Sequence, residues 1–176
     1  DDAAMIEVPA GQALVQSVDF FRTFIDDPFA FGEVAAVHAL GDVWAMGAQP
    51  HSALALAVVP AAAERLMEED LFQMLSGARR ILDGAGCSLI GGHSGEGPEA
   101  ALGFSVNGLV VASQALRKGG LKPGDKLVLT KPLGTSRTAA RCFEIAVVDR
   151  NLEVAELDRF DRHAELLRVG NGACEE

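Results

Sequence analysis

The clearest structural signal in the sequence is a helix with a marked beginning and a marked end. Asp27 is a good N-cap residue, and Pro28 is favoured at the first helical position. Apolar residues continue to Met46, and Gly47 then supplies a C-cap. We therefore expect a helix over residues 28–46.

Strand signals lie on both sides of this helix. Before it, we expect a hairpin in which Ala4–Val8 and Ala13–Val18 are joined by a turn at Pro9–Gln12. After it, His51–Val59 is a short apolar run that predicts another strand. A second helix is expected after Pro60, because apolar residues then recur at helical spacing.

The second half of the chain adds further strands. Cys87–Ile90 predicts a buried strand that stops at two glycines and leads into a polar loop over Gly95–Glu99. Ala101–Val111 and Lys126–Thr130 predict strands, and the chain after Thr135 reads as charged and helical. Because this order lacks regular strand–helix–strand alternation, it favours an α+β or mixed α/β fold.

The charge balance excludes some partners. The chain of 176 residues carries 25 acidic and 15 basic side chains, a net charge of −10. Nucleic acids and anionic membranes attract basic patches, so neither is expected as a partner. No apolar run approaches the ~20 residues of a membrane-spanning helix. Cys87, Cys142 and Cys174 form no CxxC pair, which favours a reducing, cytoplasmic compartment.

Three aspartates stand at places that packing alone does not explain. Asp2 precedes the first expected strand, Asp19 ends the second, and Asp42 lies inside an apolar helix. A buried carboxylate is costly unless it is paired or binds a metal, and Mg²⁺ prefers oxygen ligands. The pattern is compatible with a Mg²⁺–nucleotide site. The alternative is that Asp2 is exposed and that Asp42 caps the helix or pairs with His38.

Gly91-Gly92-His93-Ser94 is the second candidate for a binding site. Glycines let the backbone approach a ligand closely, and exposed N–H groups can hold a phosphate. His93 and Ser94 would add side-chain donors, although a glycine pair after a strand is commonly only a turn. His38 and His51 are more simply core or surface residues. The sequence has neither a Rossmann fingerprint nor a GxxxxGK[ST] motif, and no local catalytic triad.

Taken together, the motifs resemble the selenophosphate synthetase (selenide, water dikinase) family. The residues of these motifs especially resemble those of family members that are fused to a flavoprotein module. The resemblance covers residues 1–135 in order and rests on Asp1-Asp2-Ala3-Ala4, Val18-Asp19-Phe20-Phe21, Asp26-Asp27-Pro28-Phe29, Phe31-Gly32, Gly41-Asp42-Val43-Trp44-Ala45-Met46-Gly47-Ala48-Gln49-Pro50, Gly91-Gly92-His93-Ser94, Pro98-Glu99 and Leu129-Thr130-Lys131-Pro132-Leu133-Gly134-Thr135.

The resemblance implies a fold and an activity. The fold would be that of the aminoimidazole-ribonucleotide-synthetase-like ATP-binding superfamily: α+β, a mixed sheet with helices on one face, and a β-barrel completed across a homodimer. The activity would convert selenide, ATP and water to selenophosphate, AMP and phosphate. Alternatives are another ATP-dependent kinase or synthetase of the superfamily, such as a thiamine-monophosphate kinase, or a non-catalytic dimerisation module.

The resemblance also implies residue roles. Asp2 and Asp42 would bind Mg²⁺. Asp19 would be a carboxylate of the ATP site that contacts ATP through a bound metal ion. Gly92, His93 and Ser94 would form a loop that meets the ATP of the partner subunit. The family's reactive Cys or selenocysteine and its Lys would precede residue 1, so no catalytic residue is assigned. We expect residues 1–135 to be an ATP-binding domain, 136–176 a helical segment, and the chain a fragment without the family's C-terminal domain.

Overall fold

The computed structural model of this chain describes residues 3–117, 119, 123, 126–129 and 145–148. The chain divides into two compact units, residues 1–115 and 116–176. The described part of the second unit contains a two-stranded antiparallel sheet, β5 (Lys126–Leu129) and β6 (Ile145–Val148). The first unit carries the candidate site.

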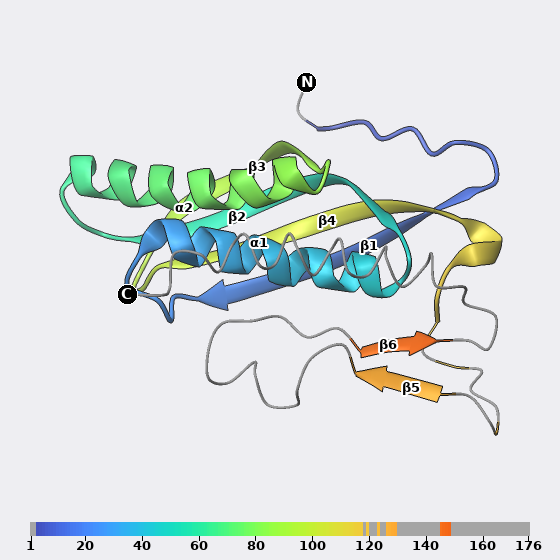
Figure 1. Ribbon diagram of the computed structural model, residues 1–176. Helices are drawn as coiled ribbons and strands as arrows, with labels where there is room; N and C mark the ends of the chain where they lie inside the picture. The colour runs from blue at the N-terminus through green and yellow to red at the C-terminus, as the bar shows by residue number, and fades with distance from the viewer. Residues whose placement is uncertain (1–2, 118, 120–122, 124–125, 130–144, 149–176) are drawn as a thin grey trace. The chain divides into compact units, whose positions relative to one another are not determined.

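The first unit is built on a mixed four-stranded sheet in the order β1-β4-β2-β3 (Figure 1). Its strands are β1 (Gln12–Arg22), β2 (Gln49–Pro60), β3 (Ser88–Gly97) and β4 (Ala101–Val111). β4 pairs antiparallel with both β1 and β2, whereas β2 and β3 are parallel. The short 3-10 helix η1 (Ala112–Gln114) follows β4.

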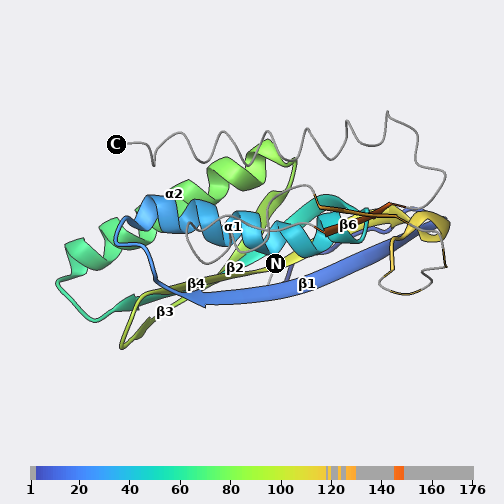
Figure 2. The ribbon, with the colours of Figure 1, turned by 60° about the horizontal axis from the view of Figure 1, so that its bottom comes forward.

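Two helices, α1 (Pro28–Ala45) and α2 (Glu64–Gly84), lie on one face of this sheet (Figure 2). α1 contacts β1 and β4, and α2 packs against α1 and contacts β2 and β3. The α+β class, the mixed sheet and the placement of the helices on one face agree with the fold expected from the sequence.

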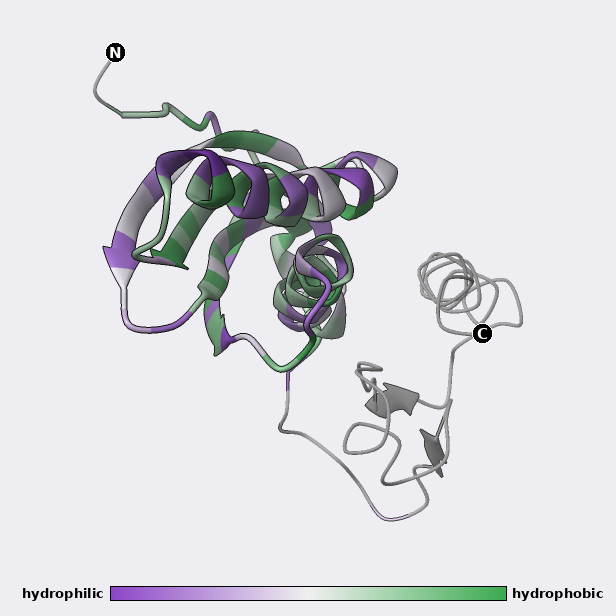
Figure 3. Cartoon of the chain, turned by 90° about the vertical axis from the view of Figure 1, so that its left-hand side faces the viewer, coloured by the Kyte–Doolittle hydropathy of each residue, from purple (hydrophilic) through white to green (hydrophobic). Residues whose placement is uncertain are grey.

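α1 begins and ends where its signals predict. The Asp27 side chain accepts hydrogen bonds from the backbone N–H groups of Phe29 (2.8 Å) and Ala30 (3.1 Å). Gly47 follows the helix with φ 69°, a conformation that favours glycine. α1 is apolar around most of its surface and is the central element of the core, whereas α2 is more hydrophilic (Figure 3). The largest fully buried side chains include Phe31, Leu40, Met74, Leu102 and Phe104.

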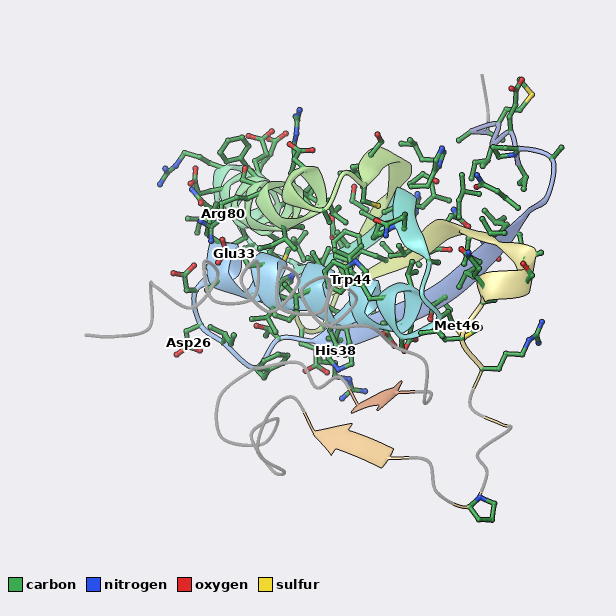
Figure 4. The ribbon with its side chains drawn as sticks, turned by 45° about the vertical axis from the view of Figure 1, so that its right-hand side comes forward. Asp26, Glu33, His38, Trp44, Met46 and Arg80 are labelled. Atoms are coloured by element: carbon green, nitrogen blue, oxygen red, sulfur yellow. The ribbon has the colours of Figure 1, made fainter. Side chains whose placement is uncertain are left out.

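The two helices cross closely because glycines stand at the crossing. A Cβ added at Gly32 would overlap the backbone carbonyl of Met74, and one at Gly77 would overlap the carbonyl of Phe29. Beside the crossing, Arg80 of α2 pairs with Glu33 of α1, whose side chain is buried (Figure 4). The crossing therefore fixes how α2 sits on α1.

Only one of the two strands expected in the N-terminal hairpin forms. The turn forms, since Gln12 N–H donates to the Pro9 carbonyl at 3.1 Å and Gly11 has φ 81°. Residues 4–8, however, form no strand, and Met5 is 90% exposed. β1 pairs instead with β4 along its whole length, so the hydrogen-bonding groups on that side of β1 are already satisfied.

Two further expectations need correction. β3 does not stop at the glycine pair but runs to Gly97, and it is an exposed edge strand rather than a buried one. Parallel pairing with β2 continues through His93 and Gly95, with one register shift near Ala53. Residues 145–148, expected to be helical, form β6, consistent with the strand propensity of isoleucine and valine, which occupy three of the four positions. The rest of that expected helix lies outside the described residues.

Candidate functional site

Two side-chain pairs join β1 to α1 at the edge of the sheet. Ser17 Oγ donates a hydrogen bond of 2.5 Å to Asp42 Oδ2. His38 Nδ1 lies 3.3 Å from Asp19 Oδ2. Two residues of a strand advance by about 6.6 Å, and four residues of a helix by about 6 Å. The distance from residue 17 to residue 19 along β1 therefore matches the distance from residue 38 to residue 42 along α1. Both aspartates lie along this contact between β1 and α1.

Local structure explains why these four residues meet. Burial along β1 alternates, with odd-numbered residues partly buried on the helix side and even-numbered residues exposed. Ser17 and Asp19 are odd-numbered and so face α1, which packs on that side. His38 and Asp42 are four residues apart on α1 and share one face of the helix. His38 lies on the side of α1 away from α2 (Figure 4).

Asp42 is exposed, which corrects the expectation of a buried carboxylate. Its neighbours Leu40 and Val43 are fully buried, so only the carboxylate points outward from the apolar helix. Asp42 does not pair with His38 as one alternative held, because its partner is Ser17. No lysine or arginine pairs with Asp19 or Asp42 within the described residues. Two accessible carboxylates thus lie about one helical turn apart along the β1–α1 contact, and among the described residues neither is paired with a lysine or an arginine.

These carboxylates are the kind of donor that Mg²⁺ prefers. Each has one oxygen engaged, by Ser17 or by His38, and in the described part of the chain neither Oδ1 has a hydrogen-bond partner. The residues present therefore fit a hard cation. The set is incomplete, since the described residues hold no group of three or more His, Cys, Asp or Glu close enough for one ion. Asp2, the other expected ligand, lies outside the described residues.

Gly92, His93 and Ser94 lie on the opposite edge of the sheet, on β3 and not in a loop. Strand pairing places Asp19, Phe104, Ala55 and Gly92 in one cross-strand row. Adjacent strands are about 4.8 Å apart, so Asp19 and Gly92 are separated by about 14 Å. Phe104 and Ala55 between them are buried. Within one chain, the structure places Asp19 and Asp42 along the same β1–α1 contact and the glycine-rich segment at the opposite edge of the sheet.

His93 belongs to the other face of the sheet. It stands in the row of Phe20, Gly103 and Leu56, where Phe20 is 51% and Leu56 43% exposed. Exposed apolar residues recur over this helix-free face, which we call the open face; they are Leu14, Val18, Phe20, Leu54, Leu56, Ile90 and Val111. An apolar sheet face of this kind indicates a contact surface.

Sequence reasoning missed two residues of the site. Ser17 received no role, and His38 was interpreted as a core or surface residue. The signals were present, because Ser17 is two residues before Asp19 in a strand and His38 is four residues before Asp42 in a helix. Only the packing of β1 on α1 reveals that these spacings match.

Comparison with known proteins identifies the family. The model of the AIR synthase related protein family, N-terminal domain, matches residues 1–112, the part that contains β1, α1 and the two aspartates. The chain belongs to this family. The match spans both edges of the sheet and therefore all of the candidate residues from Asp19 to Ser94.

Relatives of known name agree with the resemblance found in the motifs. The chain is 45% identical over 135 residues to a selenide, water dikinase of Nitratidesulfovibrio vulgaris, covering 77% of this chain and 38% of the relative. It is 38% identical over 178 residues to that of Geobacter metallireducens, covering 99% of this chain and 51% of the relative. The chain thus spans about half or less of the length of these relatives.

Solved structures support the fold. A thiamine-monophosphate kinase from Stenotrophomonas maltophilia matches with TM-score 0.70 and 26% identity over 96% of this chain and 53% of its own. The hydrogenase maturation protein HypE in complex with ATP matches with TM-score 0.61 and 19% identity, covering 72% of this chain and 38% of that one.

No helix in the described part of the chain is long and apolar enough to cross a membrane.

Proposed function

We propose that this chain is the ATP- and Mg²⁺-binding domain of a selenophosphate synthetase, which makes selenophosphate from selenide, ATP and water and releases AMP and phosphate. The observation that carries the proposal is the placement of Asp19 and Asp42 along the β1–α1 contact, where each carboxylate is held across it, Asp19 by His38 and Asp42 by Ser17. Both stand in motifs that the family resemblance assigns to the Mg²⁺–ATP site, and the relatives named selenide, water dikinase match this region.

Asp19 and Asp42, with Asp2, would hold the metal. Mg²⁺ would neutralise charge on the triphosphate, which is a large part of phosphoryl-transfer catalysis. The chain's own residues would orient the nucleotide: Ser17 and His38 each hold one oxygen of an aspartate and leave the other free for binding. This arrangement also explains how a chain with a net charge of −10 would bind a polyanion.

The two edges of the sheet would contribute to different sites of a homodimer. Asp19 and Gly92 are too far apart, and too well separated by buried residues, to contact one triphosphate in a single chain. The open face offers the surface for a second copy, and a two-fold contact uses the same patch on both chains. Such a dimer would allow Gly92, His93 and Ser94 of one copy to complete the site of the other.

The test is product formation by the intact gene product that carries this sequence. Given selenide and Mg²⁺–ATP, it is expected to form selenophosphate, detected by ³¹P NMR, together with AMP and phosphate. The absence of selenophosphate while ATP is consumed with another acceptor would contradict the proposal. A sample without selenide serves as the control for background hydrolysis.

Two alternatives follow from particular observations. The match to a thiamine-monophosphate kinase favours another acceptor for the phosphoryl group. Acceptor-dependent ATP consumption separates that activity from the proposed one. The incomplete ligand set within the described residues favours a non-catalytic dimerisation module. Dimerisation without any nucleotide affinity would support that role.

The proposal includes a domain assignment and a location. Residues 1–135 would form the ATP-binding domain and 136–176 a further C-terminal segment, which contains the strand β6; the first compact unit ends at residue 115. Selenide and ATP would be the small-molecule partners, without a nucleic acid or a membrane. The cytoplasm is the location that the cysteine pattern favours.

A further inference from the structure

The imidazole of His38 is held by two residues of β1. Its Nδ1 atom lies 3.3 Å from Asp19 Oδ2. Its ring lies over Phe21, with 4.7 Å between ring centroids and an angle of 57° between the ring planes. Phe21 is two residues after Asp19 and faces the same side of β1. The ring is therefore fixed both by a hydrogen bond and by an aromatic contact.

The partners decide which nitrogen carries the proton. An ionised carboxylate only accepts hydrogen bonds, so Nδ1–H of His38 is the donor to Asp19. The bond occupies Oδ2 and leaves Oδ1 of Asp19 without a partner among the described residues. The Asp19 side chain is 28% exposed, so the carboxylate remains accessible to solvent. Groups that hold a ligating carboxylate in this way fix its orientation.

We propose that His38 is a positioning residue for the Asp19 carboxylate: its Nδ1–H fixes Oδ2, so that Oδ1 is presented to a divalent cation and its phosphate ligand. The inference rests on the proposed Mg²⁺–ATP site and adds a residue to it. Ser17 holds Asp42 in the same way from β1, so each aspartate has one donor across the β1–α1 contact.

Two substitutions separate the hydrogen bond from the aromatic contact. His38→Phe keeps a ring over Phe21 and removes the donor. His38→Asn removes the ring but places an amide N–H near the position of Nδ1. His51→Asn is the matched control, since His51 is an exposed histidine on β2 away from Asp19.

Calorimetric titration of the chain with ATP, at several Mg²⁺ concentrations, gives the readout. We expect His38→Phe to weaken Mg²⁺-dependent ATP binding about tenfold and to raise the Mg²⁺ concentration for half-saturation. We expect His38→Asn to bind within about threefold of the wild type, and His51→Asn to bind unchanged. Tenfold corresponds to about 1.4 kcal/mol, the scale of one hydrogen bond to a charged group.

The outcomes distinguish this inference from the proposed function. Equal binding by His38→Phe and the wild type would overturn the positioning role alone. Loss of binding in His38→Asn as severe as in His38→Phe, with unchanged melting temperatures, would also overturn it. A wild-type chain without Mg²⁺-dependent ATP binding would overturn the proposed site, and with it the role of His38.

Discussion

Asp19 and Gly92 stand at the two ends of one cross-strand row, on opposite edges of the sheet. The row passes through Phe104 and Ala55, which are buried beneath the helices. A ligand at Asp19 therefore has no direct path to Gly92 in the same chain. If both residues serve one nucleotide, the second must come from another copy of the chain.

Mixing two inactive variants tests this division of the site. Asp42→Asn and His93→Ala would damage opposite edges, so each homodimer is expected to lose selenophosphate synthesis. In an equal mixture, half of the dimers pair one variant with the other and regain one intact site of two. Activity should recover to about a quarter of the wild type. A mixture as inactive as its components would contradict a site shared between copies.

A charge on the open face should break the dimer. Phe20 is 51% exposed on this face, in the edge strand β1, and Phe20→Glu would bury an unpaired carboxylate in the interface. Sedimentation equilibrium is expected to show a dimer for the wild type and a monomer for the variant. Phe72→Glu is the control, because Phe72 is 66% exposed but lies on α2. If Phe72→Glu is a monomer and Phe20→Glu remains a dimer, the dimer interface does not lie on the open face.

The glycine crossing predicts opposite effects for two similar substitutions in α1. Gly32→Ala would force a methyl group against the Met74 carbonyl and should destabilise the chain by about 1–3 kcal/mol. Gly41→Ala meets nothing within 4 Å and should stabilise it by up to about 1 kcal/mol, since alanine favours helix. Urea unfolding measures both changes, and equal effects would contradict the close crossing.

Burial of Cys87 predicts a pH dependence. Burial raises the pKa of its thiol from 9.0 to about 11, because the thiolate is poorly solvated there. A raised pKa stabilises the fold below pH 9, and this contribution falls as the pH rises toward 11. The loss is up to about 1.4 kcal/mol per pH unit. The free energy of unfolding should therefore fall more steeply over this window in the wild type than in Cys87→Ala. Equal slopes would contradict the burial effect.

Local signals predicted much of the fold. The Asp27–Pro28 start and the Gly47 end fixed α1 because capping depends on neighbouring backbone groups. The β4 strand followed from its apolar run. The first expected strand is wrong: β1 pairs with β4, about 90 residues later, and residues 4–8 form no strand on its other side. β3 was expected to stop at its glycines, but pairing with β2 carries it through them.

The candidate site was predictable only in part. Their positions at the end of a strand and inside an apolar helix marked Asp19 and Asp42, yet the exposure of Asp42 and its bond to Ser17 depend on how α1 rotates over β1. The role of His38 depends on the same contact. The row that separates Asp19 from Gly92 follows from the strand order, which local pattern does not specify.

The most direct test of the central claim is calorimetric titration of the chain with ATP, with and without Mg²⁺, for the wild type, Asp42→Asn and the control Asp70→Asn. Asp70 is an exposed aspartate on α2. The account predicts Mg²⁺-dependent binding that is weakened at least about tenfold in Asp42→Asn, or 1.4 kcal/mol, and unchanged in Asp70→Asn. Equal ATP affinities of Asp42→Asn and the wild type would contradict the aspartate–metal–triphosphate site. ATP binding that is unchanged when Mg²⁺ is removed would contradict it as well.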